Sequence, residues 1–60
     1  MRAKDYGIRA EKGRRIYWWT GREWVLSFDE AKAFPSEEEA GRVAKEIPAG
    51  CMENLRVIEI

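Results

Sequence analysis

The fold of this chain is decided by residues 4–28, which read KDYGIRAEKGRRIYWWTGREWVLSF. Apolar side chains recur there at every second position, first from Tyr6 to Ala10 and again from Trp24 to Phe28. This spacing is typical of strands rather than helices. Two short interruptions each contain a glycine, which supplies the positive φ that tight hairpins need. The stretch therefore predicts a three-stranded antiparallel meander.

Two-residue loops at residues 12–13 and 21–22 fix which side chains share a face. In this register Ala10 lies opposite Arg15, and one face, expected to be the core, collects Tyr6, Ile8, Ala10, Tyr17, Trp19, Trp24, Leu26 and Phe28. The opposite face collects Gly7, Arg9, Ile16, Trp18, Val25 and Ser27. A three-residue first loop with a bulge is the alternative, and it would turn Ile16 and Trp18 inward.

A helix follows the meander. Ser36 and Glu39 have the spacing of a capping box, and three consecutive glutamates occupy the first turn, where the helix dipole favours negative charge. Pro48 disfavours helical geometry in the residue before it, so the helix should end near residues 46–47. Its apolar stripe consists of Ala40, Val43, Ala44 and Ile47.

A last strand is expected at residues 55–60, which carry apolar side chains on both faces. If each element reverses direction, this strand runs parallel to the first strand and lies beside it. The expected architecture is a single α+β domain over residues 1–60, with strands and helix in the order β-β-β-α-β. An apolar strip on the strand's uncovered face would be left exposed or would form a dimer contact.

The charges are divided between the two ends of the chain. The 60 residues contain 11 basic and 11 acidic side chains, yet residues 1–22 have a balance of +5 and residues 23–60 a balance of −5. The neutral total argues against a strongly basic nucleic-acid binder, but the basic half can still present a cationic surface.

The inventory of side chains argues against an enzyme. The chain has no histidine, no phosphate-cradling glycine loop and no recognisable nucleophile motif. With Cys51 as its one cysteine it forms no internal disulfide, and neither a metal site, a cofactor nor a small-molecule substrate is expected. Cys51 is expected to be a small, part-buried apolar residue. No stretch has the length of a membrane span or a signal peptide, which favours a cytoplasmic location.

Two surfaces are candidates for binding. Trp18 and Trp19 are adjacent in a strand and must point to opposite faces, so one of them leaves the core. Trp18 is then an aromatic anchor on the open face, flanked by Arg9, Ile16 and Val25. These four residues form the candidate site for a protein partner, either a host factor or a second copy of the chain. The alternative is DNA binding through the basic hairpin, which carries Arg9, Lys12, Arg14, Arg15 and Arg22. A further alternative is that Glu11 and Glu37–Glu39 neutralise these bases, either inside the protein or across a dimer.

Two resemblances are carried by particular segments. YWWTG at residues 17–21, followed by Trp24 and by AKAFPSEEEA at residues 31–40, resembles a pattern of small, uncharacterised phage and prophage proteins. Residues 34–40, placed after three strands, are also similar to the arm-type DNA-binding domain of tyrosine recombinases. That resemblance implies a sheet packed on one helix with its open face in the major groove. It would turn Arg9, Arg14, Ile16 and Trp18 toward DNA.

Overall fold

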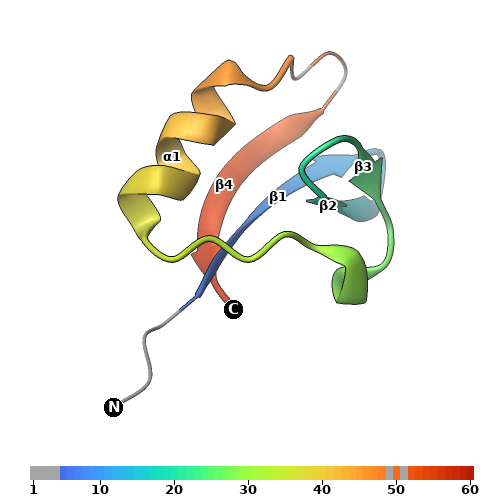
Figure 1. Ribbon diagram of the computed structural model, residues 1–60. Coiled ribbons are helices and arrows are strands. Elements are labelled where there is room, and N and C mark those ends of the chain that lie inside the picture. Colours follow the sequence, from blue (N-terminus) through green and yellow to red (C-terminus); the bar gives the residue numbers. More distant parts are fainter. Residues whose placement is uncertain (1–4, 49, 51) are drawn as a thin grey trace.

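The computed structural model describes residues 5–48, 50 and 52–60. It is a small α+β fold in which one helix packs on a four-stranded, fully antiparallel sheet with strand order β3-β2-β1-β4 (Figure 1). The predicted α+β class with one helix on the sheet is confirmed, whereas the predicted order β-β-β-α-β is matched only roughly. The elements are β1 (Tyr6–Lys12), β2 (Arg15–Trp19), β3 (Trp24–Val25), a 3-10 helix (Phe28–Glu30), α1 (Glu37–Glu46) and β4 (Glu53–Glu59).

The first hairpin turns one residue later than the sequence predicts. Its loop is Gly13-Arg14, so Ala10 lies opposite Tyr17 and the predicted pairing with Arg15 is wrong. Gly13 has a φ of +64°, and it takes the first position of the loop rather than the second. A positive φ in first position is what a type II′ hairpin requires, and glycine meets this requirement without strain.

The division of side chains between the two faces nevertheless agrees with the prediction. The register is displaced by two residues, and a displacement of two leaves every side chain on its own face. Ile8 and Ala10 are completely buried, whereas Ile16 is exposed. The second hairpin pairs Trp19 with Trp24, as predicted. The three-residue alternative for the first loop, which would have buried Ile16, is therefore wrong.

The third strand is much shorter than predicted. β3 contains Trp24 and Val25, and the chain then leaves the sheet and forms the 3-10 helix. Leu26 is 52% exposed and Phe28 51% exposed, so their predicted place in the core is wrong. Phe28 instead contacts Trp18, whose side chain lies outside the core cluster. This aromatic contact draws the chain away from the strand direction that its alternating pattern suggests.

After the 3-10 helix the chain returns to the beginning of β1. The Lys32 N–H donates to the Trp19 carbonyl at 2.8 Å, and Tyr6 and Phe34 exchange two backbone hydrogen bonds of 2.9 and 2.7 Å. β2 pairs only with residues 9–12 of β1, and residues 32–34 lie beside the earlier residues of β1, beyond the end of β2. This return decides where the helix begins.

The direction of β4 follows from that return. α1 starts at the Tyr6 end of β1 and runs toward its other end, so the strand after the helix comes back antiparallel to β1 (Figure 1). The prediction that the last strand lies beside the first is confirmed. The prediction that it runs parallel is wrong, because the long return over residues 26–36 reverses the helix relative to a regular up-and-down order.

The helix agrees with its sequence signals. The Ser36 hydroxyl accepts a hydrogen bond of 3.1 Å from the Glu39 N–H, and the helix ends at Glu46, two residues before Pro48. Ala40 and Ile47 are buried, and the rest of the predicted stripe packs beside them. Small alanines allow α1 to lie close to β1 and β4.

The core lies between α1 and the sheet. Its buried cluster consists of Ile8, Phe34, Ala40 and Ile47, against which Tyr6, Trp19, Trp24, Val43, Ala44, Leu55 and Val57 pack. The ring of Trp19 meets that of Trp24 edge to face, with centroids 5.2 Å apart. Cys51, which was predicted to be part-buried, lies outside the described residues, as do the bases Arg2 and Lys4. α1 covers this face of the sheet, and the opposite face carries the candidate site.

Candidate interface on the open sheet face

The open face of the sheet is built from alternate residues of four strands. Its central row runs Arg56, Arg9, Trp18, Val25, because these residues are paired across β4, β1, β2 and β3. A second row, Glu53, Glu11 and Ile16, lies one step closer to the first hairpin. The four residues predicted from the sequence as a partner site, Trp18, Ile16, Val25 and Arg9, therefore do share this face.

Apolar surface is exposed on both sides of the central row. Ile16 is 43% exposed, and Phe28, which is 51% exposed, packs edge to face on Trp18 with ring centroids 4.8 Å apart. On β4, Ile58 lies opposite Gly7, and Ile60 is 37% exposed. A side chain at position 7 would meet Ile60 at 3.2 Å, so the glycine lets Ile60 lie over β1.

Sequence reasoning predicted an apolar strip on the last strand but did not assign Phe28, Ile58 or Ile60 to the same face as Trp18. The register between β1 and β4 was needed to place Ile58 and Ile60. The alternation of Trp24, Leu26 and Phe28 pointed Phe28 to the wrong face. The open face is thus larger and more apolar than the four predicted residues suggest.

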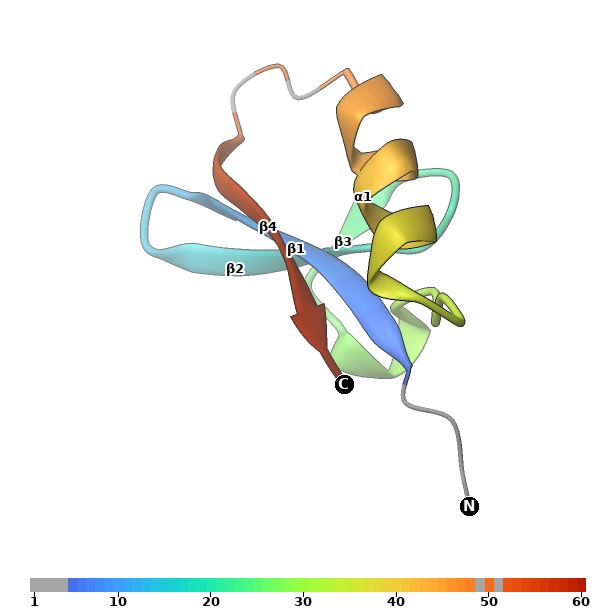
Figure 2. The ribbon, with the colours of Figure 1, turned by 90° about the vertical axis from the view of Figure 1, so that its left-hand side faces the viewer.

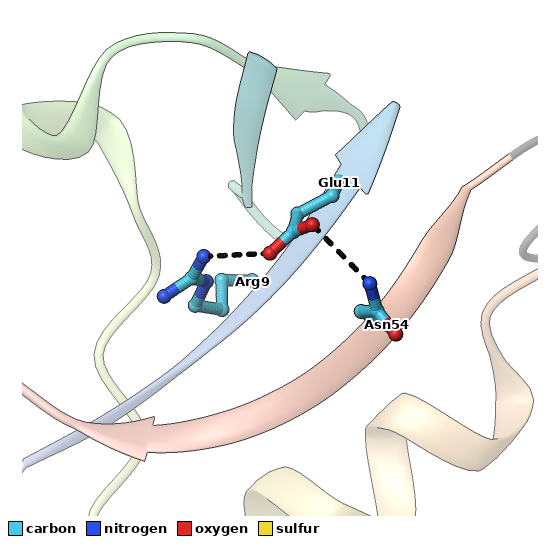
Figure 3. Close-up of polar contacts among 3 residues, drawn as sticks. All are labelled: Arg9, Glu11 and Asn54. Atoms are coloured by element: carbon cyan, nitrogen blue, oxygen red, sulfur yellow. Dashed lines mark hydrogen bonds and ion pairs between the residues drawn. The ribbon is translucent and has the colours of Figure 1, made fainter. Parts of the chain in front are cut away.

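A polar network crosses the middle of this apolar surface. The Arg9 guanidinium donates to a Glu11 carboxylate oxygen at 3.1 Å, and the other Glu11 oxygen accepts from the Asn54 amide at 3.2 Å (Figure 3). Arg9 and Glu11 are two residues apart in one strand, so both project from the open face. Arg9 is thereby neutralised by an acid of its own strand.

The network leaves one buried donor of Arg9 without a hydrogen-bond partner. Its Nε is buried and has no hydrogen-bond partner, although the side chain as a whole is 24% exposed. Arg56 lies directly opposite Arg9 on β4, which is an unfavourable arrangement of like charges. The negative charge of Glu11 offsets the repulsion between Arg9 and Arg56, which gives Glu11 a structural role.

A β-bulge in β4 brings Asn54 to Glu11. Between the pairs Arg9–Arg56 and Glu11–Glu53, β4 contains one more residue than β1. Asn54 sits in the bulge with a φ of +50°, a left-handed conformation that asparagine tolerates better than most residues. The bulge re-aims its amide toward the carboxylate (Figure 3).

The five bases of the predicted nucleic-acid surface do not form one patch. Lys12, Arg14 and Arg15 cluster at the tip of the β1–β2 hairpin and are exposed. Arg22 lies in the β2–β3 turn, at the other end of β2. Arg9 is held by Glu11 on the open face. Neutralisation by Glu11 is therefore observed for Arg9, whereas within the described residues Glu37–Glu39 form no ion pair with the hairpin.

Among the described residues, no group of three or more acidic, cysteine or histidine side chains could hold a metal ion. A shallow hollow of about 380 Å³ lies on the outer side of α1, lined by Glu38, Gly41, Arg42 and Lys45. In the described part of the chain, no helix has the length and apolar character needed to cross a membrane.

Comparison with known proteins found no matching family model, no matching curated protein and no matching solved structure.

Proposed function

We propose that this protein is a non-enzymatic binding module that engages a protein partner through the open face of its sheet. The observation that carries the proposal is the apolar surface around Trp18, where Ile16, Phe28 and Ile60 are each more than a third exposed. Several large exposed apolar side chains gathered on one face are typical of interaction sites. The partner is a second copy of the chain or another protein, such as a host factor of a phage-type module.

The composition of the face supports a protein partner. Its centre holds an aromatic residue and an arginine, Trp18 and Arg9, the residue types that contribute most to binding energy in protein interfaces. Arg9 is paired with Glu11, and Arg56 and Glu53 on β4 are equal in number and opposite in charge, so the face presents little net charge. Apolar side chains surround this pair, and they gain by being removed from water.

Self-association tests the first of the two partners. Sedimentation of the wild-type chain over a wide concentration range is compared with Ile16→Asp and with Arg42→Gln on the outer side of α1. Both substitutions change the net charge by the same amount at exposed positions, and circular dichroism verifies that both variants remain folded. Loss of association in Ile16→Asp, with wild-type behaviour in Arg42→Gln, supports the proposal.

A wild-type chain that stays monomeric directs the test to another protein. A photo-crosslinking residue is then placed at position 16 or at position 42, and the chain is incubated with an extract of the cells that produce it. A protein crosslinked from position 16 alone must, once purified, bind the wild-type chain and lose affinity for Ile16→Asp by at least about tenfold, which is about 1.4 kcal/mol. Absence of both self-association and such a partner overturns the proposal.

A further inference from the structure

The tip of the β1–β2 hairpin carries three exposed bases within four residues. Lys12 and Arg15 are paired directly across the hairpin, and Arg14 lies in the loop between them. Side chains paired in this way have Cβ atoms about 5 Å apart, and like charges at that distance repel. The fold therefore maintains a concentrated positive charge at this point, which an anion would stabilise.

The neighbouring acids do not neutralise this charge. Glu11 is occupied by Arg9 and by Asn54, and Glu53 lies opposite Glu11 on β4. Consecutive residues of a strand point to opposite faces, so Lys12 and its partner Arg15 project from the face opposite to both acids. Within the described residues, no ion pair or side-chain hydrogen bond involves Lys12, Arg14 or Arg15.

The shape of the tip favours one kind of anion. Figure 2 shows the hairpin projecting past β4, on the side of the molecule away from α1. Beyond the Glu11–Glu53 pair, the projection is two strands wide. A two-stranded ribbon fits within the major groove of B-DNA, which is about 12 Å wide and is lined by closely spaced phosphates.

We propose that this hairpin tip binds the phosphate backbone of double-stranded DNA through Lys12, Arg14 and Arg15. The binding is independent of base sequence and is confined to the tip, because the acidic half of the chain repels DNA elsewhere. This activity goes beyond the protein-binding function of the open face and uses different residues.

Fluorescence anisotropy with a labelled DNA duplex of mixed sequence tests the proposal. Three phosphate contacts predict a slope of log K against log salt of about −2.7, hence a loss of affinity of about 40-fold between about 50 and 200 mM salt. The triple variant Lys12→Gln/Arg14→Gln/Arg15→Gln should lose duplex binding. A matched variant, Arg22→Gln/Arg42→Gln/Lys45→Gln, removes the same charge elsewhere and should retain it.

The proposal is overturned by any of three results. The first is that the wild-type chain shows no duplex binding at low salt. The second is that the two triple variants lose affinity equally, and the third is that poly-glutamate competes for the chain as well as DNA does. Circular dichroism verifies that both variants remain folded. Trp18→Ala, which changes no charge, should leave duplex binding unchanged, and the tip variant should leave protein association unchanged, so failure of this proposal and failure of the open-face proposal are separate results.

Discussion

Asn54 adopts a backbone conformation that side chains other than asparagine and aspartate rarely adopt. Its φ of +50° belongs to the left-handed region, which costs an ordinary L-residue about 1–2 kcal/mol. In a regular strand alanine is more stable than glycine by about 0.5–1 kcal/mol. At position 54 the order should be reversed, because glycine accepts the positive φ and alanine does not.

This reversal is measurable with two variants. Asn54→Ala and Asn54→Gly both lose the hydrogen bond to Glu11, so the difference between them reports the backbone alone. We expect Asn54→Gly to have the higher free energy of unfolding, by about 1 kcal/mol, in urea denaturation. An Asn54→Ala variant as stable as Asn54→Gly would mean that the bulge has no left-handed residue.

At the scale of the element, α1 depends on its cap. The Ser36 hydroxyl satisfies the Glu39 N–H, and its removal in Ser36→Ala should lower the free energy of unfolding by about 1 kcal/mol. In a domain of this size that loss lowers the melting temperature by about 4–8 °C. Ser27 precedes the 3-10 helix but makes no side-chain cap, so Ser27→Ala is the matched control and should change stability by less than about 0.5 kcal/mol. Equal losses in the two variants would contradict the role of the cap.

The same element shows why some of the fold could be predicted. The signals for α1 are local, since Ser36, Glu39 and Pro48 act within a few residues of the helix ends. The hairpins are local as well, but Gly13 can occupy either position of a two-residue loop. The sequence pattern therefore determined which face each side chain of β1 and β2 takes and left the register between these strands open by two residues.

At the scale of the whole molecule, the features that were not predicted depend on distant contacts. The direction of β4 depends on the backbone pairing of Tyr6 with Phe34, and no periodicity in the sequence encodes that pairing. The open face was predicted in part because Trp18, Ile16 and Val25 follow from alternation. Ile58 joins them through pairing with β1, which depends on the return of the chain. The resemblance to phage proteins remains a prediction from sequence.

The adjacent tryptophans point to opposite faces of the sheet, one toward the core and one toward the proposed interface. Trp19 packs on the core cluster, and the ring of Trp18 rests on the half-exposed Phe28. Truncation of a core tryptophan costs about 3–5 kcal/mol, and a 60-residue chain has a total stability of about 3–9 kcal/mol. Trp19→Ala should therefore remove at least about a third, and up to all, of the free energy of unfolding.

Trp18→Ala should behave differently, because the Trp18 side chain lies outside the core cluster and at the centre of the proposed interface. We expect a loss of about 1–2 kcal/mol from its half-buried surface, with a cooperative transition retained in urea denaturation followed by circular dichroism. Association through the open face should be lost in this folded variant. A Trp18→Ala chain that is less stable than Trp19→Ala would place Trp18 in the core and would remove the central anchor from the proposed interface.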